Sequence, residues 1–277
     1  DHGLQYIAPK SKEFKKLIVK LKNKNILKEW NKFHLNSNSK KNNSTKYIGL
    51  KGNNDIVKYF IRGIKANYLS QVTSIKFHSN FWTIILNNKK KVFFKNLILT
   101  CPFPQLKILG SKYLEDKIKK LKIKMIPNIT IMLVYKDVQN LTVSSIKFND
   151  DIISWACNEN SKEKFKSNHD LWTIQLTNTY SKKIINKYKN NKIKYQKIII
   201  KKFEKLLGLS SSQVIFSNIH GWKYAYANKL NVGFKSSWNN KYRLGVCGDW
   251  LVGSKAESAW LSAHNLFKKT KKNPLKT

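Results

Sequence analysis

The chain has 277 residues, of which 41% are apolar and 12% aromatic, enough material for the core of one large domain or two ordinary ones. This composition excludes an intrinsically disordered chain, and a mean hydropathy of −0.48, with no run of about 18 apolar residues, excludes a membrane-spanning helix. The formal net charge is +39, which by itself would suggest nucleic acid or an acidic lipid as a partner.

The positive charge is carried almost entirely by lysine. Of the 54 basic residues, only Arg62 and Arg243 are arginines. Sites that grip phosphate or guanine favour the bidentate arginine fork, and the sequence shows no basic stripe interleaved with aromatic residues at a regular spacing. We therefore interpret the lysine excess as mostly compositional drift and expect no specific nucleic-acid site, although the field can still steer anionic ligands.

The cysteines also narrow the class of protein. Cys101, Cys157 and Cys247 are odd in number and far apart, so they predict neither a disulfide framework nor a metal site. This pattern is typical of a reducing compartment, and we expect a cytoplasmic protein. The chain begins with Asp1 inside an apparent strand, so we also expect residues upstream of it.

In the first quarter of the chain, Ser11 is predicted to cap a helix that runs to about residue 23. Its apolar residues at helical spacing are Phe14, Leu17, Ile18 and Leu21. The polar stretch 31–46 lacks periodicity and is predicted to be a surface loop. Asn53 or Asn54 then opens a second amphipathic helix. The residues expected to face inward there are Ile56, Val57, Phe60, Ile61 and Ile64.

Three β-like runs follow, at residues 70–77, 81–86 and 92–100, and they predict a meander that ends at Pro102 and Pro104. Further strands are predicted over 129–135, 152–156 and 171–177. A helix over 181–207 is predicted to end at Gly208, since glycine readily takes the left-handed conformation that stops a helix.

Near the end, a short strand over 244–247 runs into Gly248 and Asp249, and a helix over about 256–269 follows after a brief loop. A helix N-terminus offers unpaired amides to an electron-rich group, and a carboxylate at a strand end can accept hydrogen bonds from ribose or ribitol hydroxyls. The same residues also fit a plain turn capped by Asp249 and a helix dipole complemented by Glu257. The chain contains no Gly-x-Gly-x-x-Gly motif and no P-loop.

Five separated segments, taken in order, resemble the renalase-like flavin oxidoreductases of the flavin-containing amine oxidase superfamily. The resemblance runs from residue 1 to 266, and its first and last segments are the most specific. The segments are DHGLQYI (1–7), YIGLKGNNDIVKYF (47–60), LTCPFPQ (99–105), HGWKYA (220–225) and VCGDWLVGSKAESAWLSAHNL (246–266).

The resemblance implies a mixed α/β fold with two domains that are discontinuous in sequence. A Rossmann-like FAD/NAD(P)-binding domain would comprise 49–101 and 239–277, and an inserted mixed-sheet substrate domain would comprise 1–48 and 102–238. In the family, the glycine-rich strand, turn and helix that hold the FAD pyrophosphate precede the DHGxQY element. We therefore expect this chain to lack that first βαβ unit and to bind FAD poorly without it.

The resemblance also implies cofactor contacts in the last part of the chain. Gly248 and Asp249 would meet the ribityl and pyrophosphate groups of FAD. The head of the last helix would lie against the pyrimidine edge of the flavin through Glu257, Ser258 and Ala259, with Ser262 one turn further on.

Two earlier segments would add cofactor contacts. Val72 would meet the adenine end through its backbone, and Thr100, Cys101 and Pro102 would form the strand end beside the cofactor. Simple core packing is the alternative role for Val72, and a simple strand stop is the alternative for 100–102.

On the substrate side, the resemblance places Gln5 and Tyr6 near the flavin face. A pocket for a flat ring would be lined by Trp222 and Tyr224, with Trp155 as a weaker candidate. Alternatively, these residues are ordinary core aromatics. His220 is a weak candidate for a general base, because no orienting carboxylate stands at a readable spacing and flavin chemistry does not require one.

The sequence departs from the family in two places: residues 158–166 replace a glycine element, and Gly221 replaces the usual arginine.

The resemblance implies an FAD-dependent oxidase that takes a hydride from a small dihydronicotinamide-type or amine substrate and reduces oxygen to hydrogen peroxide. The alternative is a non-catalytic basic protein that has lost FAD and contacts nucleic acid through its lysines.

Overall fold

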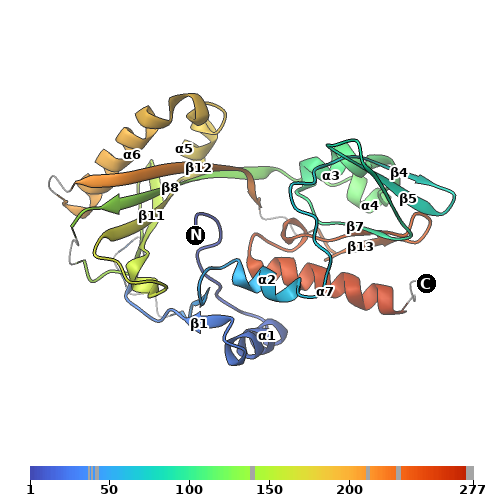
Figure 1. The fold of residues 1–277 in the computed structure, drawn as a ribbon, viewed down its shortest axis with the longest axis horizontal. Coiled ribbons are helices and arrows are strands. Elements are labelled where there is room, and N and C mark those ends of the chain that lie inside the picture. The colour runs from blue at the N-terminus through green and yellow to red at the C-terminus, as the bar shows by residue number, and fades with distance from the viewer. Residues whose placement is uncertain are drawn as a thin grey trace. The chain divides into compact units, whose positions relative to one another are not determined.

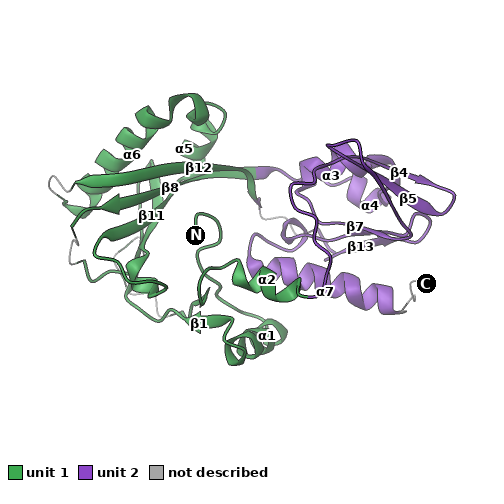
Figure 2. Ribbon diagram, in the orientation of Figure 1, with its two compact units in different colours: residues 1–62, 126–225 green, residues 63–125, 226–277 purple. Residues whose placement is uncertain are grey.

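The computed structural model describes residues 1–36, 38, 40, 44–137, 141–209, 213–228 and 232–272 (Figure 1). The chain divides into two compact units (Figure 2). Unit 1 contains residues 1–62 and 126–225, and unit 2 contains residues 63–125 and 226–277. In the part of the chain that is described, we find no helix with both the length and the apolar character needed to cross a membrane.

Unit 1 is built on a six-stranded sheet in the order β12-β8-β11-β10-β9-β2. Neighbours from β8 to β9 pair antiparallel, whereas β2 and β9 are parallel. The strands are β2 (His34–Leu35), β8 (Met125–Tyr135), β9 (Ser145–Lys147), β10 (Ile153–Asn158), β11 (Asp170–Leu176) and β12 (Val214–Ala227). The stretch 31–46, predicted to be only a loop, therefore contains a strand, because His34 and Leu35 pair with β9.

Two helices, α5 (Asn178–Ile184) and α6 (Lys192–Leu207), lie along one face of this sheet (Figure 1). Ile199 and Phe203 of α6 are fully buried, and the Phe203 ring packs 5.2 Å from that of Trp172 on β11. The predicted single helix over 181–207 is wrong: a 3-10 turn, η3 (Tyr188–Asn191), separates the two helices. The predicted stop is confirmed, since Gly208 caps α6 with a φ of 66°.

The first helix, α1 (Lys12–Asn23), confirms the predicted cap, because the Ser11 side chain accepts a hydrogen bond from the backbone N–H of Phe14. Its apolar side buries Phe14, Ile18 and Leu21. Two short strands, β1 (Leu27–Glu29) and β3 (Tyr47–Gly49), then pair antiparallel.

The second predicted helix differs from expectation. α2 (Asp55–Phe60) has only six residues and buries none of them. Val57, Phe60 and Ile64 are 59%, 45% and 64% exposed. Gly63, with a φ of 75°, bends the chain away soon after α2 ends. Helical spacing of apolar residues defines a face, but burial also requires a partner to cover that face.

Unit 2 contains the predicted meander as a separate antiparallel sheet, made of β4 (Val72–His78), β5 (Phe81–Leu86) and β6 (Lys91–Phe94). The third predicted run, 92–100, is split in two. Its second half, β7 (Leu97–Leu99), leaves the meander and pairs in parallel with β14 (Leu244–Val246). β13 (Ser237–Asn239) pairs antiparallel on the other side of β14, so β7 is an edge strand among the described residues.

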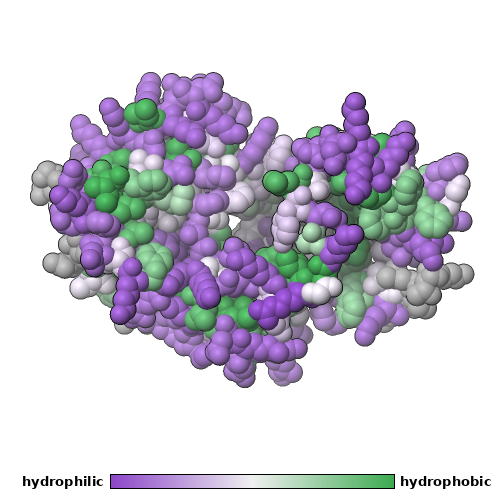
Figure 3. All heavy atoms as spheres, in the orientation of Figure 1, coloured by the Kyte–Doolittle hydropathy of each residue, from purple (hydrophilic) through white to green (hydrophobic). Residues whose placement is uncertain are grey.

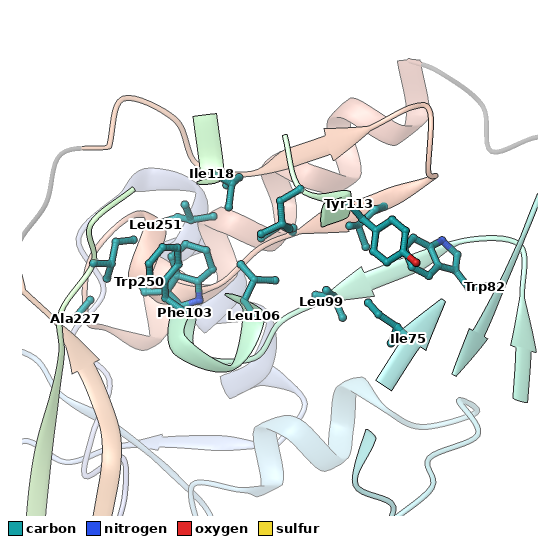
Figure 4. Close-up of a cluster of buried hydrophobic side chains, with 14 of the residues drawn as sticks. Ile75, Trp82, Leu99, Phe103, Leu106, Tyr113, Ile118, Ala227, Trp250 and Leu251 are labelled. Carbon is teal, nitrogen blue, oxygen red and sulfur yellow. The ribbon is translucent and has the colours of Figure 1, made fainter. Parts of the chain in front are cut away.

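The core of unit 2 is formed by side chains from these sheets, from the helices α3 (Phe103–Gly110) and α4 (Asp116–Lys119), and from Trp250 and Leu251 (Figure 4). The last helix, α7 (Ala256–Lys272), packs beside β13. Figure 4 shows Phe103 and Trp250 together, and Tyr113 beside Trp82. The Trp82 indole is fully buried and donates its N–H to the Tyr242 carbonyl at 2.8 Å. This bond satisfies the polar atom of a large buried side chain.

The two units are defined by packing alone. They differ from the domain division that the resemblance implied in three stretches. Residues 49–62 belong to unit 1, and residues 102–125 and 226–238 belong to unit 2. The assignment of a cofactor half and a substrate half stays a prediction.

At Gly221 on β12, the neighbouring side chains leave no room for a Cβ atom. A Cβ at this position would lie 2.6 Å from Tyr188 Cε1 and 2.7 Å from Ile185 Cδ1, and the Gly221 amide donates to the Tyr188 hydroxyl at 3.0 Å.

Gly221→Ala should lower the free energy of unfolding by about 1–3 kcal/mol, measured by urea denaturation, because the packed side chains must move. Asn218→Ala, at an exposed position of the same strand, should change it by less than about 0.5 kcal/mol. Equal urea midpoints for the two variants would contradict the close approach.

Candidate functional site

The strand, Gly-Asp turn and helix predicted near the end of the chain form one connected element in unit 2. β14 leads into the 3-10 turn η4 (Asp249–Leu251), and α7 follows. A Cβ on Gly248 would lie 2.4 Å from the indole nitrogen of Trp250, so only glycine fits there. The Gly248 amide donates to Ser262 Oγ at 2.9 Å, and that hydroxyl donates to the Lys235 carbonyl at 2.6 Å. The turn is therefore fixed directly against α7.

The strand end at residues 100–102 meets the same turn. The Trp250 indole donates to the Cys101 carbonyl at 3.1 Å, and the Cys247 amide donates to the Leu99 carbonyl at 3.2 Å. Pro102 stands at the N-cap of α3, and Phe103 packs 5.3 Å from Trp250, measured between ring centroids. The structure thus brings Thr100, Cys101 and Pro102 to the Gly-Asp turn.

The Asp249 carboxylate is half-buried, and burial raises its pKa, against the opposing effect of nearby backbone amides. Its backbone carbonyl accepts hydrogen bonds from Val252 and Gly253. Among the described residues, no side chain donates to the Asp249 carboxylate. Its donors are the backbone amides of Asp249 and Trp250, and a carboxylate can accept further hydrogen bonds from ligand hydroxyls.

The other predicted cofactor residues lie in different surroundings. Glu257 and Ser258 are buried in the first turn of α7, whereas Ala259 is exposed. Ser262 is fully buried and its hydroxyl is already engaged on both sides, so its observed role is to hold the turn. Val72 lies in the other sheet of unit 2, opposite Leu86 on β5, and packs against the core.

In unit 1, the predicted substrate residue Gln5 is buried in a network of hydrogen bonds. Its side-chain amide donates to the carbonyls of Asp1 and Gly3, and its oxygen accepts from Lys162 Nζ at 2.9 Å. Gln175 also donates to the Gly3 carbonyl, at 3.3 Å. The DHGLQY segment is therefore held in one conformation by side chains far away in the sequence.

Lys162 belongs to a buried charge cluster that the sequence did not reveal. Its ammonium lies 2.7 Å from Glu159 Oε1 and 5.2 Å from the Trp30 ring centroid. Thr173 Oγ1 donates to the same carboxylate oxygen at 2.7 Å, and the Cys157 thiol lies 3.3 Å from it. Because Glu159 and Lys162 lie in the polar stretch 158–166, the sequence pattern there is that of an exposed loop. The only local indication of an ion pair is their spacing of three residues.

The electrostatics of this cluster follow from its burial. Burial alone would raise the pKa of Glu159, but Lys162, the amino terminus of the chain and the Thr173 hydrogen bond together hold that pKa below its usual value. Burial raises the pKa of the Cys157 thiol well above its usual value, so Cys157 stays protonated and acts as a hydrogen-bond donor. The cluster is a satisfied ion pair with additional donors.

Two groups of aromatic rings flank this segment of unit 1. The Tyr6 ring lies 6.1 Å from that of Trp30 and 6.2 Å from that of Trp155, with Lys46 Nζ 5.6 Å over it. Two of the predicted pocket residues, Tyr6 and Trp155, are thus neighbours.

The second group joins His2, His220 and Trp222. Trp222 stacks at 5.3 Å on His2 and donates its indole N–H to the His2 carbonyl, while the two imidazoles are 4.4 Å apart. Trp222 remains 39% exposed. Tyr224, two residues further along β12, is half-buried.

The surroundings of His220 disfavour its protonated form. Burial lowers its pKa, and the neighbouring His2 and Lys189 lower it further. No carboxylate bonds to His220 within the described part of the chain. Among the residues that the structure describes, no group of three or more His, Cys, Asp or Glu could hold a metal ion, and the three cysteines are free thiols.

No model of a known protein family matches the chain. Among solved structures, it is similar to a protein assigned as protoporphyrinogen oxidase from Exiguobacterium sp. 255-15, with 9% identity and a TM-score of 0.56 over 80% of this chain and 52% of that one. An oxidoreductase from Methanosarcina mazei gives 13% identity and 0.56 over 83% and 56%. Wild-type putrescine oxidase bound to putrescine gives 10% identity and 0.61 over 83% and 54%.

These likenesses concern the fold. The chain spans about half the length of the structures it matches. It has the mixed α/β fold of these oxidoreductases, as the resemblance implied.

The buried ion pair yields a test of stability and of its pH dependence. Lys162→Met leaves the Glu159 carboxylate buried without its cation, so it should cost about 3–5 kcal/mol of unfolding free energy. Lys166→Met, at an exposed lysine of the same segment, should be close to neutral. Urea denaturation at neutral pH measures both.

The sign of the pH effect follows from the lowered pKa of Glu159. Its ionisation stabilises the fold above the unfolded value of 4.5, and that contribution is lost as the pH falls through the lower folded value. Between pH 7 and about pH 3, the parent should lose more stability than the double variant Glu159→Gln, Lys162→Met. Parallel pH profiles would show that the pair is not coupled as the distances indicate.

Proposed function

We propose that the protein is an FAD-dependent oxidoreductase whose Gly-Asp turn in unit 2 holds the flavin nucleotide. The observation that carries the proposal is the joined element of β14, Gly248, Asp249 and α7, which the strand end at 100–102 meets through Trp250. The fold likeness to oxidases supports it, as does the sequence resemblance to the flavin-containing amine oxidases. A protein that has lost its cofactor is not favoured. The turn still requires glycine at position 248, and the Asp249 carboxylate can still accept hydrogen bonds.

The residues fit the ribityl and flavin part of FAD. Asp249 would accept hydroxyl hydrogen bonds, and the first turn of α7, with Glu257, Ser258 and Ala259, would present a positive helix end to the flavin. Thr100 and Pro102 would border it, and the backbone of Val72 would meet the adenine end. Bound flavin would supply the acceptor for a hydride and pass the electrons to oxygen.

For the substrate, we propose a small reduced ring, with Tyr6, Trp155, Trp222 and Tyr224 as the residues that recognise it. Gln5 would hold the first segment in place beneath them, since its amide and its oxygen are already engaged within unit 1. Trp222 supports this role because its indole is held in place by the bond to His2 and is still exposed. An aromatic face of this kind favours a flat ring. The net charge of +39 attracts anions and repels amines, so a dihydronicotinamide nucleotide is preferred over a cationic amine.

The cofactor proposal is tested with Asp249→Ala in the protein expressed from its complete coding sequence. Loss of charge-assisted hydrogen bonds should weaken FAD binding about 10- to 150-fold, measured by the flavin absorbance retained on dilution. Asp116→Ala removes an exposed carboxylate of the same unit and should leave FAD binding unchanged. A colourless parent protein that FAD cannot reconstitute would refute flavin binding, and equal retention in both variants would remove Asp249 from the site.

The substrate proposal is tested on the flavin-loaded protein. In the absence of oxygen, a dihydronicotinamide nucleotide should bleach the flavin band faster than putrescine does, and in air one hydrogen peroxide should form per substrate oxidised. Trp222→Leu should weaken substrate binding about 2- to 12-fold through lost stacking. Phe165→Leu, at an exposed ring of unit 1, is the matched control. Faster bleaching by the amine would overturn the substrate class while leaving the cofactor proposal intact.

A further inference from the structure

The outer face of the meander sheet in unit 2 exposes aromatic rings where a solvated sheet face normally carries polar residues. Side chains alternate between the two faces of a strand. Ile75, Trp82 and Ile84 point to the core and are buried. The residues that alternate with them include Phe81 and Phe93, which are 45% and 63% exposed.

Strand pairing assembles these rings with cationic side chains. Phe93 lies opposite Thr83, and Thr83 lies opposite Lys76, so one row across the sheet reads Lys76, Thr83, Phe93. The neighbouring row begins with His78 opposite Phe81. Phe81 and Phe93 are diagonal neighbours on adjacent strands, about 7–8 Å apart, so one bound segment can touch both.

Lysines surround the two rings without acidic residues among them. Lys91 lies opposite Ile85 in the next row, and Lys89, Lys90 and Lys95 are exposed at the ends of β6. No Asp or Glu occurs between Asp55 and Glu115 in the sequence. Within the described residues, none of these lysines forms an ion pair. Their charge is therefore available to a partner.

Figure 3 shows hydrophobic side chains lying exposed among hydrophilic ones over the region where Figure 1 labels β4 and β5. Exposed phenyl rings bordered by uncompensated lysines match the chemistry of a single-stranded nucleic acid, whose bases stack on aromatic faces while its phosphates meet cations. A second copy of this chain would bring another net charge of +39 to the same face, so repulsion disfavours self-association.

We propose that the outer face of the β4-β5-β6 sheet binds single-stranded nucleic acid, with Phe81 and Phe93 stacking on bases and Lys76 and Lys91 contacting phosphates. Binding of this kind tolerates many sequences, because every base offers a π-face. The proposal does not depend on the oxidoreductase function. The sequence alone did not reveal this surface, because Lys76, Phe81 and Phe93 become neighbours only through strand pairing.

The test uses the 277-residue chain and a labelled oligonucleotide of about 12 thymidines, with binding followed by fluorescence anisotropy. Phe81→Ala and Phe93→Ala should each weaken binding about fivefold or more, and the double variant should weaken it further. Phe216→Ala is the matched control, since that ring is 53% exposed on β12 in unit 1 and should have little effect.

The lysines are tested by the salt dependence of the same binding. The double variant Lys76→Gln, Lys91→Gln should reduce the slope of log affinity against log salt by about 1.4, while Lys12→Gln, Lys16→Gln on α1 should leave it unchanged. Photo-crosslinking of the parent should place thymidine on peptides from β5 and β6, independently of how well any variant folds. Equal affinity of the parent and both phenylalanine variants, crosslinks confined to other peptides, or a dimer abolished by Phe93→Ala would each overturn the proposal.

Discussion

The close approach of Trp250 to Gly248 is the constraint on which unit 2 depends. The indole occupies the space that any side chain at position 248 would need, and its N–H reaches the Cys101 carbonyl. This contact extends the parallel pairing of β14 and β7, two strands far apart in the sequence, beyond the ends of both strands. The ends of both strands and the start of α7 therefore meet at one point, which is where a ligand of an open α/β sheet is expected.

Unit 1 depends on a different kind of constraint. Moving a lysine and a glutamate out of water is costly, and their attraction compensates for it only when the remaining donors and acceptors are also satisfied. Here Thr173 and Cys157 supply donors to Glu159, and Gln5 supplies an acceptor to Lys162. Because Gln5 belongs to the first segment of the chain, the ion pair also fixes that segment in place.

The sequence was informative where the signal is local. The Ser11 cap, the meander and the turn at Gly248 each depend on neighbouring residues, and the structure contains all three. β12 was missed because its residues are mostly half-buried or exposed, so they show no clean alternation. The Glu159–Lys162 pair was missed because its burial depends on Trp30 and Thr173, which are distant in sequence. The roles of the cofactor and substrate residues stay predictions, since proximity within a unit does not identify a ligand.

The position of β7 has a practical consequence for handling this chain. Among the described residues, β7 pairs with a neighbouring strand along one edge only. The faces of parallel sheets are usually covered, yet Ile98 of β7 is 51% exposed. An uncovered edge of this kind offers free amides and carbonyls to any extended peptide. During purification, a short competing peptide, or a solubilising partner fused next to this edge, would protect the chain from aggregation. Added salt would protect it less well, because salt screens the repulsion between lysines that keeps the molecules apart.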